Sequence, residues 1–114
     1  MSGLTALLCW LLLAAAADLA GRWNFKAVSP DGEDLAKLTV VQKGEKITGS
    51  FESSRGVYQM EGTVEGSEIR FTVRYTGGGE SLTVPFHGTI EGDKMTGKFQ
   101  AGEVAGSWSA ERGK

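Results

Sequence analysis

The chain has 114 residues, with 12 Lys or Arg and 14 Asp or Glu, so its formal charge at pH 7 is −2. Both signs are mixed along the chain without blocks of like charge, which gives no electrostatic reason to expect a nucleic acid or an anionic membrane as partner. The length is that of one small domain.

The N-terminal segment indicates the compartment. Residues 4–13 are almost wholly apolar and run into four alanines at residues 14–17, although no Lys or Arg precedes them. The stretch is too short to span a bilayer, and its end fits an A-x-A cleavage site. We therefore expect a signal peptide over residues 1–17, one domain over residues 18–114 and a secreted or periplasmic protein; the alternative is a buried core helix. Cys9 is the only cysteine, so the mature chain should lack disulfides.

Eight runs typical of strands follow, separated by turn sequences such as P-D-G-E-D, E-G-S and A-G-E-V. The sequence K-G-E-K-I-T-G-S-F at residues 43–51 returns as E-G-D-K-M-T-G-K-F at residues 91–99, and each copy reads as a strand end, a Gly turn and the next strand. Because no segment after the signal has a 3.6-residue apolar stripe, we expect an all-β antiparallel meander. The predicted strands cover about residues 21–28, 35–42, 46–53, 57–64, 68–75, 81–90, 94–100 and 105–112.

Alternation of apolar and polar residues predicts how the meander closes. One side of two adjacent runs carries only apolar residues, namely Ile69, Phe71, Val73 and Tyr75, then Leu82, Val84, Phe86 and Ile90. This side must be buried, so an eight-stranded up-and-down meander should roll into a small barrel, which also removes its edges. An outer-membrane barrel would need apolar residues outside, so no membrane insertion of the mature chain is expected.

Six residues in the strands require explanation. Five glycines fall on the apolar side, and a repeated inward glycine marks either a sharp bend of a small barrel or room for another group: Gly49, Gly62, Gly88, Gly97 and Gly106. Pro85 lies in mid-strand and cannot donate to a ladder, so we expect a bulge there or a seam where closure is incomplete.

The sequence Gly21-Arg22-Trp23, followed by the meander and by Arg112 in the last run, resembles the calycin group, the lipocalins and avidins. In those families a G-x-W tryptophan plugs one end of the barrel, and a basic residue of the final strand packs across it. The resemblance implies that Trp23 and Arg112 form such a barrel-closing pair.

Residues 47–53, I-T-G-S-F-E-S, resemble the avidin segment L-T-G-T-Y-E-S. Phe25 and Phe51 stand where avidins have the Asn and Tyr that help to bind biotin, and they offer no hydrogen bond, although Ser53 is retained. The pocket tryptophans also lack counterparts, so we do not expect biotin binding. The mature chain is similar, too, to short secreted bacterial β domains, found alone or attached to exported amidohydrolase-like enzymes, which implies no established activity.

The sequence contains no recognisable set of catalytic or metal-binding residues. His87 is the only histidine, so no His or Cys set could hold zinc, and no G-x-S-x-G elbow is present. The acidic residues Asp31, Glu33, Asp34 and Asp93 fall in predicted turns, where such residues bond the local backbone. We expect no enzyme, no metal and no cofactor. A basic outward stripe is expected from Arg70 and Arg74 with His87 on the partner strand, and the sequence leaves open whether Arg55 lies near them. This stripe is either a solvated face or a contact for an anion or a protein.

Two leading functions remain, with an unrecognised enzyme as a third. The first is a secreted barrel that binds a small apolar or amphipathic ligand inside or at an open end, lined by Phe25, Phe51, Phe71, Phe86 and Phe99. The second is a fully packed barrel that acts as an interaction or accessory module of another exported protein. A cavity of about 300 Å³ or more would distinguish them, depending on whether the inward glycines leave it open.

Overall fold

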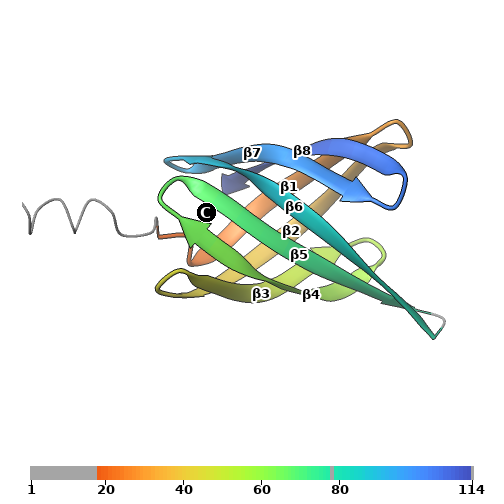
Figure 1. The fold of residues 1–114 in the computed structure, drawn as a ribbon, viewed down its shortest axis with the longest axis horizontal. Coiled ribbons are helices and arrows are strands. Elements are labelled where there is room, and N and C mark those ends of the chain that lie inside the picture. Colours follow the sequence, from red (N-terminus) through yellow and green to blue (C-terminus); the bar gives the residue numbers. More distant parts are fainter. Residues whose placement is uncertain (1–17, 78, 114) are drawn as a thin grey trace, which may run out of the picture.

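The computed structural model describes residues 18–77 and 79–113; the predicted signal peptide, residues 1–17, lies outside them. Each strand pairs antiparallel with the next, and the last pairs with the first, so the sheet is a closed barrel (Figure 1). This confirms the predicted eight-stranded meander. Among the described residues, no helix is long and apolar enough to cross a membrane. The strands are β1 Gly21–Ser29, β2 Gly32–Lys43, β3 Lys46–Ser53, β4 Gly56–Glu65, β5 Glu68–Gly77, β6 Glu80–Glu91, β7 Lys94–Ala101 and β8 Val104–Arg112.

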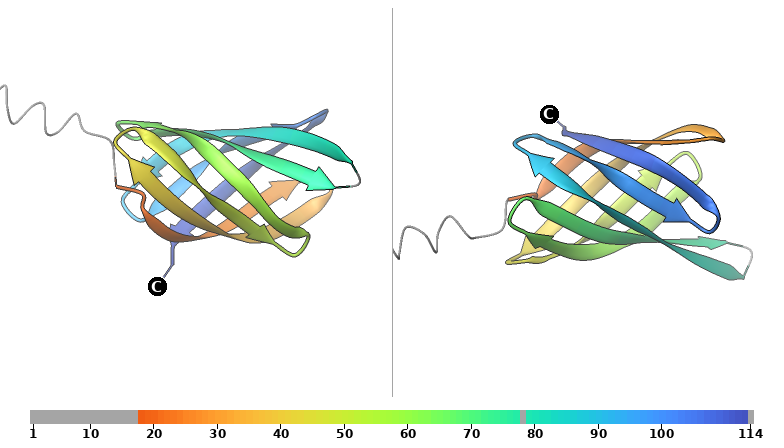
Figure 2. Two further views of the ribbon diagram at one scale, coloured as in Figure 1. Left: turned by 90° about the horizontal axis from the view of Figure 1, so that it is seen from below. Right: turned by 45° about the horizontal axis from the view of Figure 1, so that its top comes forward.

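Three two-residue turns with glycine first join β2 to β3, β4 to β5 and β6 to β7; a fourth, at Gly102, joins β7 to β8. The glycines of the first three, Gly44, Gly66 and Gly92, have φ angles of 62°, 59° and 62°, which is left-handed backbone that favours glycine. Glycine at the first central position is typical of type II′ hairpins, whose twist matches that of the strands. These three turns lie at the barrel end where the chain enters, which we call the closed end; the other four turns form the splayed end (Figures 1 and 2).

The inward side chains fill the barrel in two zones. Near the closed end they are Trp23 and mainly aliphatic residues such as Leu38, Ile47 and Ile69, all at most 1% exposed. Beyond them lies an aromatic cluster in which ring centroids are 4.8 to 6.5 Å apart, formed by Phe25, Phe51, Phe71, Phe86 and Trp108. Aromatic pairs at these separations add to the stabilisation that burial provides.

The inward glycines lie where neighbouring strand backbones come close. A Cβ atom at Gly97 would meet the carbonyl oxygen of His87 and lie 2.6 Å from Gly88 Cα, and one at Gly62 would lie 2.6 Å from Phe71 Cα. Gly49, Gly88 and Gly106 would also meet the backbone of an adjacent strand. Of the two interpretations of these glycines, the structure supports sharp bending, because backbone occupies the space beside them.

Of the two alternatives predicted at Pro85, a bulge or a seam, the structure excludes the bulge. β5 and β6 pair one to one through Thr72 and Pro85, and the pairing of β6 with β7 begins at Phe86, the next residue. Pro85 therefore stands where the ladder with β7 ends, a place that tolerates a residue without an N–H. Leu82 lies beyond this point and is 50% exposed, so its predicted burial is wrong: the hairpin has left the barrel wall there.

Candidate functional site

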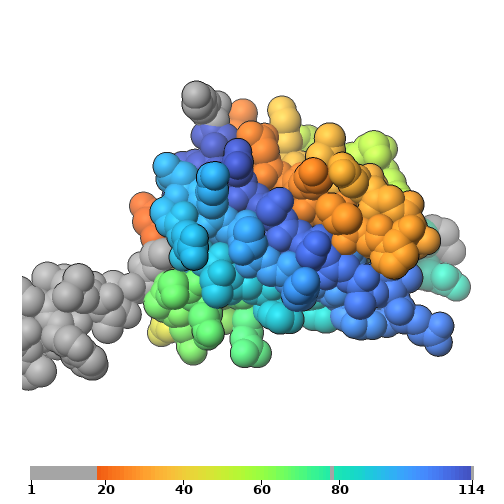
Figure 3. Space-filling model, turned by 90° about the horizontal axis from the view of Figure 1, so that it is seen from above, coloured from red at the N-terminus to blue at the C-terminus, as the bar shows by residue number. Residues whose placement is uncertain are grey.

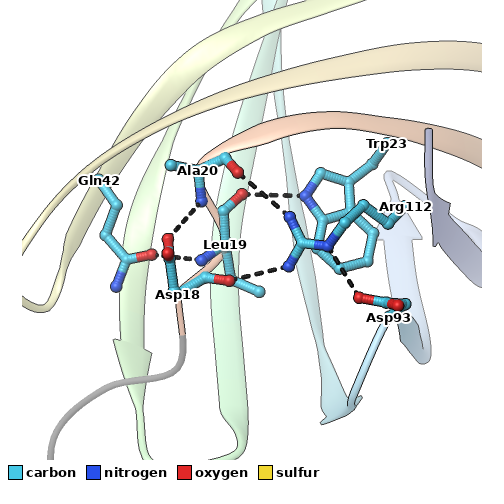
Figure 4. Close-up of polar contacts among 7 residues, drawn as sticks. All are labelled: Asp18, Leu19, Ala20, Trp23, Gln42, Asp93 and Arg112. Atoms are coloured by element: carbon cyan, nitrogen blue, oxygen red, sulfur yellow. Dashed lines mark hydrogen bonds and ion pairs between the residues drawn. The ribbon is translucent and has the colours of Figure 1, made fainter. Parts of the chain in front are cut away.

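Trp23 and Arg112 lie together at the closed end (Figure 4). Trp23 is fully buried and its Nε1 donates a hydrogen bond of 2.9 Å to the carbonyl of Leu19. The Arg112 guanidinium lies 4.4 Å from the centre of the indole ring, within the range of a cation–π contact.

The same arginine fixes the N-terminal segment across the barrel. Arg112 donates to the carbonyls of Asp18 at 2.9 Å and Ala20 at 3.2 Å, and its Nε donates to the Asp93 carboxylate at 2.9 Å. Leu19 is fully buried, and its N–H donates to the Gln42 side chain at 2.7 Å (Figure 4). Residues 18–20 thereby form a lid over this end of the barrel.

The closed-end turns also hold the strands beside them. The carbonyl of each second turn residue accepts a hydrogen bond from a neighbouring strand: Glu45 from Val64 at 2.8 Å, Ser67 from Ile90 at 2.7 Å and Asp93 from Arg112 at 2.9 Å. Gly113 donates to the carbonyl of Arg22 at 2.7 Å, which extends the β8–β1 pairing. Backbone bonds and the lid together seal this end, so access for a ligand must be sought elsewhere.

At the splayed end the hairpins separate from one another (Figure 2). Pairing between β2 and β3 starts only at Ala36 and Ser53, and pairing between β4 and β5 starts only at Gln59 and Arg74. Strands β2 and β6, of 12 residues each, extend past β3 and β7, of 8 residues each. Four of the five exposed large apolar residues among the described ones lie at this end, at 39 to 70% exposure: Val28, Leu35, Val57 and Leu82.

The five phenylalanines predicted to line a ligand site do come together, but as packed core. Phe25, Phe51, Phe71 and Phe86 are 2 to 3% exposed. Phe71 and Phe86 stack with their centroids 4.8 Å apart, and Phe99, partly buried, lies 5.3 Å from Phe86. A ligand in the interior would have to displace these rings.

Two tyrosines continue the aromatic cluster to the splayed end, and sequence reasoning did not single them out as site residues. Tyr75 lies 6.0 Å from Phe51 and 4.7 Å from Tyr58, whose hydroxyl donates to the carbonyl of Arg55 at 3.2 Å. Arg55 also pairs with the Asp34 carboxylate at 4.0 Å. Burial raises the pKa of Tyr75 to about 12; the Asp34 carboxylate adds to the rise and the Arg55 guanidinium opposes it. Both tyrosines fall on the inward side in the alternation of apolar and polar residues, and this signal could have identified the opening at the splayed end, which we call the mouth.

A hollow of about 520 Å³ lies over β1, β2 and β3 at this end. It is lined by Asn24, Phe25, Leu35, Ala36, Lys37, Glu52, Ser53 and Ser54. Three more hollows, of about 440, 410 and 250 Å³, lie on the outer wall; the first reaches the splayed end at Arg74 and the second at Val28. Seen from above, the atoms of β1, β2, β7 and β8 form a continuous wall (Figure 3).

The basic residues divide between two places. Arg70 lies directly beside His87 on the outer wall, whereas Arg74 lies further along β5, beside Thr83. Arg55 belongs to the splayed end, where it pairs with Asp34. Within residues 18–77 and 79–113, no group of three His, Cys, Asp or Glu side chains is placed to hold a metal ion.

Comparison with known proteins identifies a fold and not a family. No protein-family model and no curated protein matches the chain. Among solved structures, it is similar to a mutant of the fluorescent protein UnaG, with a TM-score of 0.53 and 14% sequence identity, over 84% of this chain and 96% of the other. This similarity concerns the fold alone, and it agrees with the predicted eight-stranded barrel.

Proposed function

We propose that the protein is an exported, non-catalytic binding module that takes a small apolar or amphipathic ligand at the splayed end of its barrel. The observation that carries this proposal is the difference between the two ends. One is sealed by Trp23, Arg112 and the N-terminal lid, whereas the other combines separated hairpins, partly exposed aromatic rings and a hollow of about 520 Å³. That volume is within the usual range for small-molecule sites, about 300–1,000 Å³.

The chemistry of this end favours an amphipathic ligand. Leu35 is 70% exposed beside the hollow, so an apolar group that covers it removes apolar surface from water. Polar groups stand close by, in Ser53 of the hollow and in the Asp34–Arg55 pair of the same end. A ligand with an apolar body and a polar head would satisfy both, whereas a buried unpaired charge would be costly.

Tryptophan fluorescence provides the test, because Phe25 of the hollow stacks on Trp108 with centroids 5.5 Å apart. We expect saturable changes on titration with a fatty acid such as dodecanoate. Leu35→Ser should weaken binding by about fivefold, since it removes apolar surface whose coverage by the ligand contributes roughly 1 kcal/mol. Val41→Ser is the matched control, because Val41 is a 55% exposed aliphatic residue of the same strand and does not line the hollow. Equal weakening by both variants, or no saturable change, would contradict the proposal.

Export rests on the apolar residues 4–13 and on the alanines that follow them. The protein recovered outside the cytoplasm should begin at Asp18 and lack Cys9, which N-terminal sequencing would establish. An intact residue 1–17 segment on the exported protein would refute cleavage.

The packed interior favours a second candidate, an accessory module that binds another exported protein, for example an amidohydrolase-like enzyme. The rings of Phe25, Phe51 and Phe86 occupy the space that an enclosed ligand would need. Native mass spectrometry of the protein from its own source distinguishes the candidates, since a stoichiometric protein partner without a small bound mass supports the second one.

A further inference from the structure

Five basic side chains lie in one row across six neighbouring strands of the outer wall, and all five are exposed. Since neighbouring strands are about 4.8 Å apart, the stretch of the row from β3 to β7 is about 19 Å long. The register sets Lys43 beside Lys46, Lys46 beside Thr63, Thr63 beside Arg70, Arg70 beside His87 and His87 beside Lys98. We call these six residues the cationic row.

The side chains of this row have no ion pair within the described part of the chain. Other lysines of the barrel do: Lys26 pairs with Glu33 at 3.5 Å and Lys94 with Glu111 at 3.8 Å. The basic groups of the row are therefore available to an external anion.

Carboxylates border the row on both sides. Glu61 lies two residues from Thr63 along β4 on one side, and Glu65 lies two residues away on the other, where it pairs with Glu68 of β5. Two residues of a strand correspond to about 7 Å. A broad anionic surface would meet these carboxylates, whereas a narrow chain that follows the row would not.

The neighbouring outward residues indicate what kind of chain fits. In β3 to β7, all within the described residues, no Phe, Tyr or Trp faces outward, so bases would find no stacking platform and a protein or membrane no aromatic anchor. Hydroxyl groups surround the row instead, from Thr48, Thr63, Thr72, Thr89 and Thr96. Charged and hydroxyl groups together match a carbohydrate polyanion.

We propose that the cationic row binds a linear acidic polysaccharide, with its sulfate or carboxylate groups facing the basic side chains and its hydroxyls bonded to the threonines. The wall curves from β3 through β7 (Figure 2), so a flexible chain can follow the row, whereas a flat bilayer can touch only part of it. This surface is independent of the proposed ligand site, because none of its residues lines the hollow at the splayed end.

The test is calorimetric titration of the whole protein with dextran sulfate at about 0.1 M salt, where exposed charges still attract over roughly 10 Å. The row variant is Lys46→Gln with Arg70→Gln and Lys98→Gln. The control is Lys26→Gln with Lys37→Gln and Lys94→Gln, which removes an equal number of positive charges outside the row. We expect the row variant to bind at least about tenfold more weakly and the control to change by about twofold or less. Both variants should keep the parent's melting temperature closely, because all six positions are exposed.

Several results would overturn the proposal. One is no binding of dextran sulfate by the parent protein, and another is equal weakening in the two variants. Uncharged dextran must not bind. If polyglutamate, oligothymidylate or vesicles of phosphatidylglycerol bind as tightly as dextran sulfate and depend equally on the row, the partner is a peptide, a nucleic acid or a membrane, and the assignment to a polysaccharide is wrong.

Discussion

Replacing Trp23 by alanine tests whether the closed end stabilises the barrel. The side chain is fully buried and its Nε1 donates to the carbonyl of Leu19, so Trp23→Ala removes core contacts and leaves that carbonyl without its partner. Truncation of a buried aromatic residue costs about 3–5 kcal/mol. A domain of this size has a total stability of about 5–15 kcal/mol, so the loss is a large fraction of it.

Arg112→Ala should cost less, about 1–3 kcal/mol, because the Arg112 side chain is 31% exposed and water can replace its hydrogen bonds to the lid. Urea unfolding and thermal melting measure both changes, and Trp23→Ala should lower the melting temperature by more than about 10 °C. Arg22→Ala is the control, since Arg22 is an exposed outward residue of the same strand. A Trp23→Ala protein that melts with the parent would refute the reasoning, and so would an Arg112→Ala protein that is the less stable of the two.

Two further predictions concern stability. Gly97→Ala should destabilise the barrel strongly or prevent folding, because its Cβ would meet the His87 carbonyl and lie 2.6 Å from Gly88 Cα. The control is Gly77→Ala, whose Cβ would have nothing within 4 Å, and it should change the unfolding free energy by about 1 kcal/mol or less. Equal effects of the two variants in urea unfolding would contradict this prediction. Because burial raises the pKa of Tyr75 to about 12, from its usual 10, the folded state holds this proton more tightly, and the associated stability is present below pH 10 and lost between pH 10 and 12. Tyr75→Phe should remove that part of the alkaline loss, and unfolding midpoints that fall equally in parent and variant over this range would contradict it.

The pattern of neighbouring residues was sufficient to predict the strands and, apart from Leu82, which residues of the two patterned strands are inward. Period-2 alternation and the Gly-x turns are properties of neighbouring residues, and both predicted the meander. The same information left the inward glycines ambiguous, because the choice between bending and an open cavity depends on how closely a strand approaches its neighbour. Gly97 shows this: its contact is with His87 and Gly88 of the adjacent strand, which no local pattern specifies.

Which outward residues of different strands lie side by side in one row of the outer wall could not be predicted from the sequence, for a similar reason. Alternation correctly placed Arg70 and Arg74 on one face, but a face contains several rows, and only the register between strands assigns a residue to one of them. Arg74 falls outside the cationic row, while Lys46 and Lys98, from β3 and β7, fall inside it. Arg55, left unplaced by the sequence, belongs to the mouth because the β3–β4 turn brings it to Asp34.

The sequence repeat corresponds to two similar halves of the barrel, and the differences between these halves make one side of the splayed end the better ligand site. Strands β1 to β4 have 9, 12, 8 and 10 residues and β5 to β8 have 10, 12, 8 and 9, so the barrel consists of two similar halves. A long hairpin and a short hairpin alternate around this end, so the longer hairpins extend past the shorter ones. The halves differ in their side chains: where β4 has Tyr58 beside the turn, the corresponding position of β8 is Gly106, and where β2 has Asp34, β6 has Leu82. The polar and aromatic groups therefore gather on one side of a nearly symmetric mouth, and an amphipathic ligand would be oriented by that difference.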